Sequence, residues 1–272
     1  MDALLNKLER ILRELESVLV AFSGGADSSL LLRVAHGVLG HRVKAITFVS
    51  PLMPRRERLR AVAFCRDQAV EHIIATVDAL EISEIRNNPP DRCYYCKRHL
   101  LLVGIAKTRE IGLAHLVDGS QLSDRLDYRP GRRALAELGI RSPLAEAGLD
   151  KEEVRRLSRS LGLPSWDLPP AACLASRIPF GTPLTMERLA RVDAAEEYLL
   201  QHGFTLVRVR DMGGEASIEL SLEEFPRWAD EGFRGRVVTY FRELGFGSVR
   251  LDPEGYGTGK LNALIMKGRE RL

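Results

Sequence analysis

A glycine-rich turn near the start of the chain has the composition of an anion-binding loop. The apolar residues 18–22 lead directly into Ser23-Gly24-Gly25-Ala26-Asp27-Ser28-Ser29, and a helical pattern follows at residues 28–39. Glycine tolerates backbone angles that let a ligand approach closely, and the free N–H groups at a helix start attract phosphate. Three serine hydroxyls add further hydrogen-bond donors. We therefore expect this segment, called the phosphate loop below, to bind phosphate groups.

Asp27 is an acid within a loop that otherwise favours an anion. A Mg²⁺ ion between this carboxylate and bound phosphates would reconcile the charges, because Mg²⁺ takes oxygen ligands from both. The loop lacks the Gly-Lys-Ser/Thr ending of a Walker A motif and the spacing of the dinucleotide-binding fingerprint. Asp27 is therefore a candidate catalytic residue that faces a metal ion. A tight glycine turn without a ligand is the simpler alternative.

The four cysteines are the second group of residues that can do chemistry. Cys93 and Cys96 form a Cys-x-x-Cys pair, which is compatible with a redox pair, half of a zinc site or part of an iron–sulfur site. Together with Cys173 they would offer three thiolates to a [4Fe-4S] cluster and leave one iron open to sulfide. Cys173 as a lone sulfur donor is the alternative. Cys65 is expected to be a buried small hydrophobic residue.

Arginine and glutamate side chains in the last third form a third candidate group. Arg208 and Arg210 stand two residues apart in an expected strand, so both project from one face. Two adjacent guanidinium groups suit a phosphate, and Ser176 and Arg177 are candidates for the same clamp. The neighbouring acids Glu196 and Glu197 lie on an expected helix, and one of them is a candidate catalytic acid near Cys173. Solvated surface positions are the alternative for each.

Alternating strands and helices must position these residues. In the first two thirds, strands are expected at residues 18–22, 43–49, 72–77 and 115–118, and helices at 28–39, 55–70, 98–112 and 150–161. This alternation predicts an α/β fold with a parallel sheet sandwiched by helices.

A proline-rich segment at residues 162–172 marks a boundary after which the pattern changes. A small C-terminal α+β domain is expected from helices at residues 185–202 and 222–244, the second interrupted by Pro226, and strands at 205–209, 216–220 and 248–251. The predicted domains are residues 1–170, which would bind ATP, and residues 171–272, which would bind substrate and transfer sulfur.

Composition limits the partners. A net charge of +3 is a small basic excess, so a nucleic-acid partner is not expected. No apolar run approaches the roughly 18 residues of a membrane span, so no membrane association is expected. The N-terminal apolar residues recur at helical spacing between charged ones, which indicates an amphipathic helix and not a signal peptide. We therefore expect a cytoplasmic protein.

Together these segments resemble the N-type ATP pyrophosphatases, also called PP-loop enzymes. Within that superfamily they resemble the sulfur transferases that build the nickel-pincer nucleotide cofactor of lactate racemase. The resemblance covers nearly the whole chain. It rests on the phosphate loop, Asp118-Gly119-Ser120, Asp124, Asp127-Tyr128-Arg129-Pro130-Gly131, Arg141-Ser142-Pro143-Leu144, residues 172–181, and Arg208 with Arg210.

The resemblance implies an adenine nucleotide alpha-hydrolase-like fold, ATP and Mg²⁺ as cofactors, and a small nucleotide substrate, pyridinium-3,5-biscarboxylate mononucleotide. Each carboxylate would be adenylated, releasing pyrophosphate, and then converted to a thiocarboxylate with loss of AMP. Cys173 matches the sulfur attachment position, which single-cysteine members sacrifice. Because Cys93 and Cys96 are also present, the chain resembles the three-cysteine subgroup, which holds a [4Fe-4S] cluster and uses external sulfide or another sulfur donor. The resemblance also implies a homo-oligomer.

Three other functions fit parts of this pattern. A tRNA-thiolating PP-loop enzyme also combines a phosphate loop with cysteines, but would show a broader basic surface. An amide-forming synthetase would need an ammonia source and would leave the cysteines unexplained. A nucleotide-binding cluster carrier without enzymatic activity would release no pyrophosphate with any carboxylate.

Overall fold

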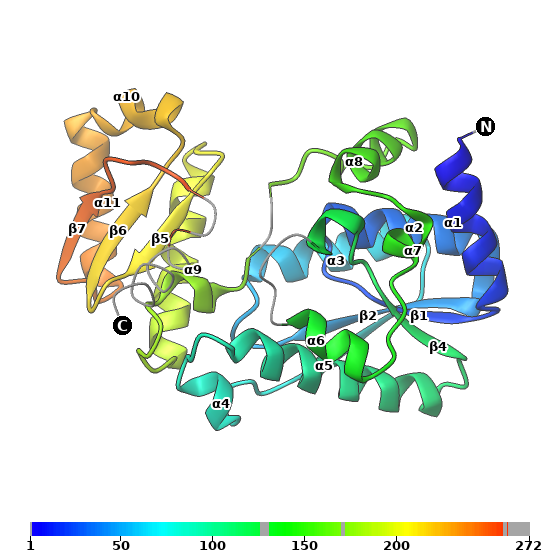
Figure 1. Ribbon diagram of the computed structural model, residues 1–272. Coiled ribbons are helices and arrows are strands. Elements are labelled where there is room, and N and C mark those ends of the chain that lie inside the picture. Colours follow the sequence, from blue (N-terminus) through cyan, green and yellow to red (C-terminus); the bar gives the residue numbers. More distant parts are fainter. Residues whose placement is uncertain (1, 126–130, 170–171, 258–259, 261–272) are drawn as a thin grey trace. The chain divides into compact units, whose positions relative to one another are not determined.

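The computed structural model describes residues 2–125, 131–169, 172–257 and 260 (Figure 1). These residues divide into two compact units. Unit 1 contains the described residues of 1–78 and 91–171, and unit 2 contains those of 79–90 and 172–272. Residues 79–90 thus belong to unit 2, although the segments before and after them belong to unit 1. The sequence pattern did not indicate this.

Unit 1 is built on a parallel sheet of four strands in the order β3-β2-β1-β4. The strands are β1 (Val18–Ala21), β2 (Val43–Val49), β3 (His72–Thr76) and β4 (His115–Asp118). Val18 of the central strand pairs with Val43 on one side and with His115 on the other. Short, nearly continuous apolar strands are typical of a sheet covered on both faces. The parallel sheet flanked by helices confirms the expected α/β class.

Helices cover both faces of this sheet (Figure 1). One face packs against α1 (Ala3–Glu14), α2 (Ala26–Leu39), α3 (Arg55–Asp67), α7 (Pro143–Ala147) and α8 (Lys151–Ser160). The other packs against α5 (Arg92–Glu110) and α6 (Gly131–Glu137). Side chains alternate along a strand, so Val18 and Val20 join the first core and Leu19 joins the second. The short 3₁₀ helices η1 (Gly40–Arg42) and η2 (Leu122–Arg125) complete the unit.

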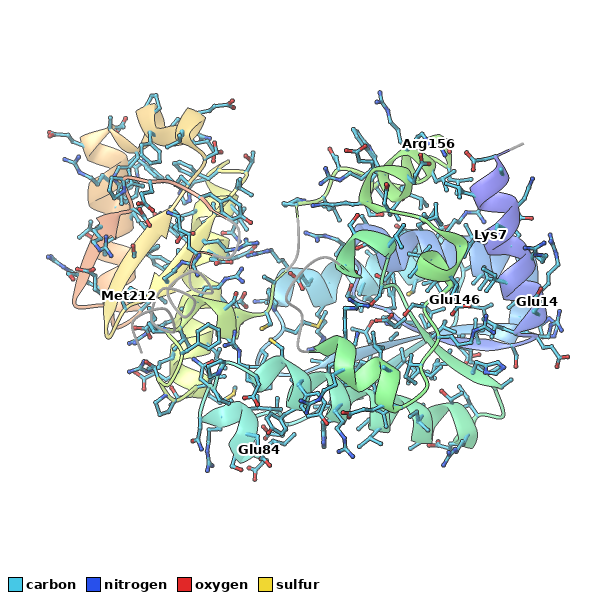
Figure 2. The ribbon with its side chains drawn as sticks, in the orientation of Figure 1. Lys7, Glu14, Glu84, Glu146, Arg156 and Met212 are labelled. Atoms are coloured by element: carbon cyan, nitrogen blue, oxygen red, sulfur yellow. The ribbon has the colours of Figure 1, made fainter. Side chains whose placement is uncertain are left out.

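The N-terminal helix α1 has the amphipathic arrangement expected from its sequence. Leu8 and Leu12 are fully buried, whereas Lys7 and Glu14 point outward (Figure 2). Cys65 on α3 is buried in the same core, which confirms its expected structural role. None of the helices in the described ranges is both long and apolar enough to cross a bilayer.

Helix α5 differs from the sequence prediction in a way that matters for the cysteines. It begins at Arg92, six residues before the expected start, so Cys93 and Cys96 lie in its first turns and not in a preceding loop. Tyr94 packs into the core that α5 shares with α6, and this tertiary contact favours helix where local pattern did not. The short helices α6 and α7 were also not predicted.

Unit 2 contains a three-stranded sheet in the order β5-β6-β7. Strands β5 (Arg208–Asp211) and β6 (Glu215–Glu219) are antiparallel, and β7 (Ser248–Leu251) runs parallel to β6. Its helices are α9 (Met186–Gln201), α11 (Glu231–Glu243) and the short α4 (Ser83–Arg86), α10 (Phe225–Trp228), η3 (Leu174–Arg177) and η4 (Leu222–Glu224). Strand β5 begins three residues later than expected and ends at Asp211, two residues beyond the expected end, so it contains both Arg208 and Arg210.

Candidate functional site

A cavity of about 430 Å³ opens in unit 1 at the carboxyl ends of β1 and β4. From β1 the chain continues to β2 and β3 on one side of the sheet, whereas β4 lies on the other side. Ligands of open α/β sheets bind where the strand order reverses in this way. The cavity is lined by Ala21, Ser23, Gly25, Ala26, Asp27, Ser28, Lys97, Asp118, Gly119, Ser120, Gln121, Asp124, Lys151, Arg155, Leu168 and Pro169.

The phosphate loop forms one wall of this cavity. It connects β1 to α2, and Gly25 is the residue that precedes the helix. The hydroxyl oxygens of Ser23 and Ser28 lie 3.1 Å apart, and the Ser28 hydroxyl also donates to the Gly25 carbonyl at 3.2 Å. These contacts fold the loop back on the helix start, where N–H groups without a helical partner favour an anion.

Two glycines allow this wall to form. Gly24 has a φ of 76°, and a Cβ there would lie 3.1 Å from the backbone nitrogen of Ala61. Gly119 follows β4, and a Cβ there would lie 3.0 Å from the backbone nitrogen of Ser28. Any larger residue at either position would push against main chain, which cannot yield easily. The close packing fixes the phosphate loop against both α3 and the end of β4.

Asp118 at the end of β4 organises the opposite wall. Its carboxylate accepts from the Lys97 ammonium at 2.8 Å, from the Ser142 hydroxyl at 2.8 Å, and from the Ser120 hydroxyl and N–H, each at 3.0 Å. Burial alone would raise the pKa of Asp118. The Lys97 charge and these hydrogen bonds outweigh burial and hold the pKa below its ordinary value. Asp118 is therefore ionised at neutral pH.

Three cationic side chains from two helices line the cavity: Lys97 of α5, and Lys151 and Arg155 of α8. Asp150 caps α8 by accepting from the Glu153 N–H at 2.9 Å, which fixes where the helix starts. Lys151 and Arg155 are four residues apart and so share one face of it. A cavity with cations around a phosphate loop is suited to a polyphosphate.

Sequence reasoning found part of this cavity. Ser23, Gly25, Asp27 and Ser28 line it, whereas Ser29 is fully buried and Gly24 packs on Ala61. Lys97, Lys151, Arg155 and Gln121 were missed. The four-residue spacing of Lys151 and Arg155 was the available signal, but it does not say where the helix face points. Asp124 lines the cavity, while Asp127 and Arg129 lie outside the described residues.

The predicted sulfur-handling thiols are divided between the two units. Cys93 and Cys96 lie on α5 in unit 1, and Cys173 immediately precedes η3 in unit 2. Cys93 is exposed, and Cys96 and Cys173 are half-buried. Within the described ranges, no three or more His, Cys, Asp or Glu side chains are grouped as a metal site. Their role as cluster ligands stays a prediction.

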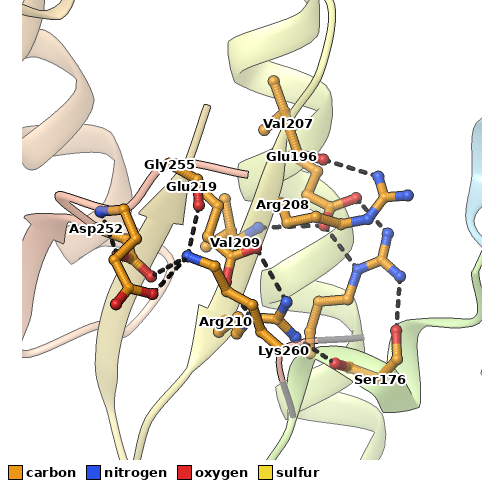
Figure 3. A network of polar contacts seen from close by, with 12 residues as sticks. Ser176, Glu196, Val207, Arg208, Val209, Arg210, Glu219, Asp252, Gly255 and Lys260 are labelled. Carbon is orange, nitrogen blue, oxygen red and sulfur yellow. Dashed lines mark hydrogen bonds and ion pairs between the residues drawn. The ribbon is translucent and has the colours of Figure 1, made fainter. Parts of the chain in front are cut away.

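The main chain around Cys173 is part of a polar network in unit 2, of which Figure 3 shows Ser176, Glu196 and Arg210. Arg177 is fully buried, and its guanidinium donates to Glu196 at 2.8 and 3.0 Å. The same guanidinium donates to the carbonyls of Ala172 and Cys173 at 2.7 and 3.1 Å. Glu196 is also fully buried, whereas Glu197 accepts from Gln201 on the exposed side of α9. The structure therefore distinguishes these two adjacent acids.

Arg208 and Arg210 occupy one face of β5, and each is 8% exposed. Arg210 donates to the Glu219 carboxylate and to the Ser176 carbonyl at 2.8 Å. The guanidinium carbon of Arg208 lies 5.3 Å from the centre of the Tyr256 ring. Ser176 thus contacts Arg210, and Arg208 lies on the same strand face as Arg210. Their role as a phosphate clamp stays a prediction, and Arg210 already has a carboxylate partner.

Comparisons with known proteins identify full-length relatives. No protein-family model matches the chain. It is 38% identical over 261 residues to the pyridinium-3,5-bisthiocarboxylic acid mononucleotide synthase of Lactiplantibacillus plantarum, covering 95% of this chain and 93% of that protein. An uncharacterized protein of Synechocystis is 40% identical over 98% of this chain and 100% of its own. An uncharacterized protein of Methanocaldococcus jannaschii is 26% identical over 89% of this chain and 91% of its own.

Proposed function

The chain belongs to the family of pyridinium-3,5-bisthiocarboxylic acid mononucleotide synthases, and from that premise we propose that it is an ATP-dependent sulfurtransferase. Its substrate would be pyridinium-3,5-biscarboxylate mononucleotide, whose carboxylates become thiocarboxylates in the synthesis of a nickel-pincer nucleotide cofactor. The observation that supports this most directly is the unit 1 cavity, where the phosphate loop, Asp27 and three cationic side chains surround one space.

The first step of the proposed reaction is adenylation. A carboxylate oxygen of the substrate attacks the α-phosphorus of ATP, the bond to the β-phosphate oxygen breaks, and pyrophosphate leaves. The phosphate loop would hold the polyphosphate through N–H groups and serine hydroxyls. Lys97, Lys151 and Arg155 would offset the charge that builds on the leaving pyrophosphate.

A Mg²⁺ ion fits the donor groups of the cavity. Asp27 and Asp124 line the same space as the phosphate loop. Hard cations such as Mg²⁺ bind through one or two carboxylates together with substrate phosphates. In this proposal Asp27 is the metal-facing acid, and the ion would supply charge neutralisation on the phosphates.

The second step exchanges AMP for sulfur. When sulfide is the nucleophile, it attacks the adenylated carbonyl carbon, the bond to AMP breaks, and a thiocarboxylate remains. When the Cys173 thiolate attacks instead, AMP leaves and a thioester forms; loss of the Cys173 α-proton and cleavage of its Cβ–S bond would then give the thiocarboxylate and leave dehydroalanine in the chain. Cys173 is the proposed sulfur attachment position. The donor chemistry of Cys93, Cys96 and Cys173 suits a [4Fe-4S] cluster, because such clusters take thiolate ligands. When bound, the cluster would supply an iron position open to sulfide.

The substrate's own phosphate needs a second anion site. Arg208, Arg210 and Ser176 are the proposed clamp, and the fully buried Arg177 supports it indirectly by donating to the Ser176 hydroxyl at 2.9 Å. Two arginines on one strand face, with the Ser176 carbonyl bound to Arg210, support this choice. Because Arg210 also binds the Glu219 carboxylate, a phosphate would join a guanidinium group that is already held in place. Two separate phosphate sites would let one protein hold ATP and a nucleotide substrate at the same time.

Pyrophosphate release tests the proposed adenylation. Purified protein is mixed with ATP, Mg²⁺ and pyridinium-3,5-biscarboxylate mononucleotide, and pyrophosphate and AMP are quantified. Release should depend on the substrate, and Asp27→Asn should slow it by about a hundredfold or more, because the metal-facing charge is lost. The matched control is Asp67→Asn, an exposed aspartate at the end of α3. Substrate-independent release, or equal rates in both variants, would reject the proposal.

The intact mass of the protein after the same reaction identifies the sulfur source. Loss of H₂S from Cys173 indicates a sacrificed cysteine. An unchanged chain with several turnovers in added sulfide indicates external sulfur. If the mass of the chain is unchanged and pyrophosphate is released but no thiocarboxylate forms, adenylation would be supported and sulfur transfer rejected.

A further inference from the structure

The two peptide carbonyls on either side of the Cys173 Cα are held by a dense set of donors. The carbonyl of Cys173 accepts from the Ser176 N–H at 3.0 Å, the Ser176 hydroxyl at 2.8 Å and Arg177 Nη1 at 3.1 Å. The carbonyl of Ala172 accepts from the same Arg177 nitrogen at 2.7 Å. Because these two carbonyls flank the Cα of Cys173, fixing both also fixes the direction of its Cα–Cβ bond.

The guanidinium that reaches these carbonyls is itself held in place. Glu196 of α9 binds the Nε and Nη2 of Arg177 in a two-point pair, and both side chains are fully buried. Glu196 Oε1 also accepts from the Val209 N–H of β5 at 3.1 Å. One carboxylate therefore links α9, β5 and the guanidinium, so Arg177 cannot turn without breaking its bonds to a carboxylate that two elements hold in place.

A second buried side chain holds the segment after η3. Asn88 has a φ of 54° and is fully buried, and its amide nitrogen donates to the carbonyls of Ile178 and Pro179 at 3.2 and 2.8 Å. The N–H of Gly181 donates back to the Asn88 carbonyl at 2.9 Å. The segment from Ala172 to Gly181 is thus fixed at both ends.

A buried ion pair contributes little to stability over apolar residues of similar volume, because removing two charges from water is costly. The Arg177–Glu196 pair does something that an apolar pair cannot do, since it supplies donors to loop carbonyls. We propose that Arg177 and Glu196 are positioning residues that hold the main chain of Cys173, and with it the direction of the Cα–Cβ bond that carries the thiol. This inference rests on the proposed role of Cys173 in sulfur transfer.

Alkylation of Cys173 tests the positioning directly. Reduced, iron-free protein is treated with iodoacetamide, and modification of each cysteine is followed by mass spectrometry of its peptide. Glu196→Gln removes the charge that anchors Arg177 while it keeps the side-chain volume. The loop should open more often, and Cys173 should react faster, on the order of tenfold. Alkylation needs neither ATP nor substrate, so failure of the proposed function would leave this result intact.

Asp211→Asn is the matched control. Asp211 is a fully buried carboxylate of unit 2 that pairs with Arg191 and accepts from the Gly214 N–H. It contacts neither carbonyl beside Cys173. The variant should be destabilised to a similar degree, yet its Cys173 should react at the wild-type rate. Equal acceleration in both variants would mean general loosening of unit 2 and would reject the positioning role.

A double variant controls for unfolding of the single variant. Arg177→Met with Glu196→Leu replaces both partners by apolar residues of similar volume, which a folded core often tolerates. Its circular dichroism should match wild type, while its Cys173 reacts faster. In turnover, kcat should fall with little change in KM for ATP or substrate. Wild-type alkylation of the folded double variant would overturn the inference, and so would a higher substrate KM with unchanged kcat, which would assign Arg177 to the phosphate clamp.

Discussion

At the residue scale, the chemistry of the unit 1 cavity depends on side chains that approach from distant parts of the chain. Part of this site could be predicted, because Ser23, Gly25, Asp27 and Ser28 belong to one continuous motif whose composition is typical of a phosphate-binding loop. Lys97 and Arg155 could not be predicted, because each is an ordinary cation within a helix until the fold turns it inward. A local motif is visible in sequence, whereas a site assembled from several elements is not.

Asp118 connects these two kinds of residue and gives a pH-dependent prediction. Its pKa is lower in the folded protein than in the unfolded chain, where an aspartate titrates near pH 3.9. A carboxyl group whose pKa is lowered by folding stabilises the folded protein at pH values above its unfolded pKa. This stabilisation is lost as the pH falls through its folded pKa. Asp118→Asn should therefore lower the free energy of unfolding at pH 7 by about 2 kcal/mol.

Denaturant titrations at several pH values check this. The difference between wild type and Asp118→Asn should shrink below about pH 4, because the unfolded wild-type chain then binds a proton that the folded carboxylate does not, and it should be lost once the pH falls through the lowered folded pKa. Asp67→Asn should show no comparable difference, since its carboxylate is mostly exposed. A deficit in Asp118→Asn that stays constant from pH 7 to pH 3 would contradict the ion-pair explanation.

At the element scale, strands and long amphipathic helices follow from sequence, and contact-dependent elements do not. Strands β2, β4 and β7 have the predicted ends, because each is a short segment with apolar residues that a glycine or proline bounds closely on both sides. The first turns of α5 were missed because residues 92–97 show no helical period. Their helix depends on Tyr94, which packs against α6, an element that the sequence pattern did not reveal.

Two helical glycines show how the same substitution has opposite effects in different packing. A methyl group added at Gly235 of α11 would meet open space, whereas at Gly104 of α5 it would lie 2.7 Å from Leu116 and 3.1 Å from Phe48. Alanine is favoured over glycine in a helix by about 1 kcal/mol. Gly235→Ala should therefore raise the free energy of unfolding by up to about 1 kcal/mol. Gly104→Ala should lower it by about 1 kcal/mol, because overpacking exceeds the helical gain.

Chemical denaturation midpoints of the two variants provide the comparison. The substitution is chemically identical in both, so only the space around each methyl group separates the outcomes. Equal stabilisation of both variants would show that α5 does not need a glycine to pack closely on β4.

At the scale of the whole molecule, the chain forms two units that each bury their own core. A boundary near residue 170 could be predicted from its prolines, and the units do part there. The assignment of residues 79–90 to unit 2 could not be predicted, because a short segment without a change in composition gives no signal in the sequence. The functional residues are divided in the same way, with the phosphate loop in unit 1 and Cys173, Arg208 and Arg210 in unit 2.

This division predicts where ATP protects the backbone. At a hundred times its dissociation constant, a ligand stabilises the state that binds it by about 2.7 kcal/mol, which slows exchange through opening of that state about a hundredfold. Because the phosphate loop and all the cavity-lining residues lie in unit 1, Mg²⁺–ATP should slow hydrogen exchange at residues 23–29 and 118–121. Strands β5 and β6, in unit 2, should exchange as in the free protein. Hydrogen-exchange mass spectrometry with Asp27→Asn as the control measures this, and equal protection of β5 and β6 would show that ATP binding stabilises both units together.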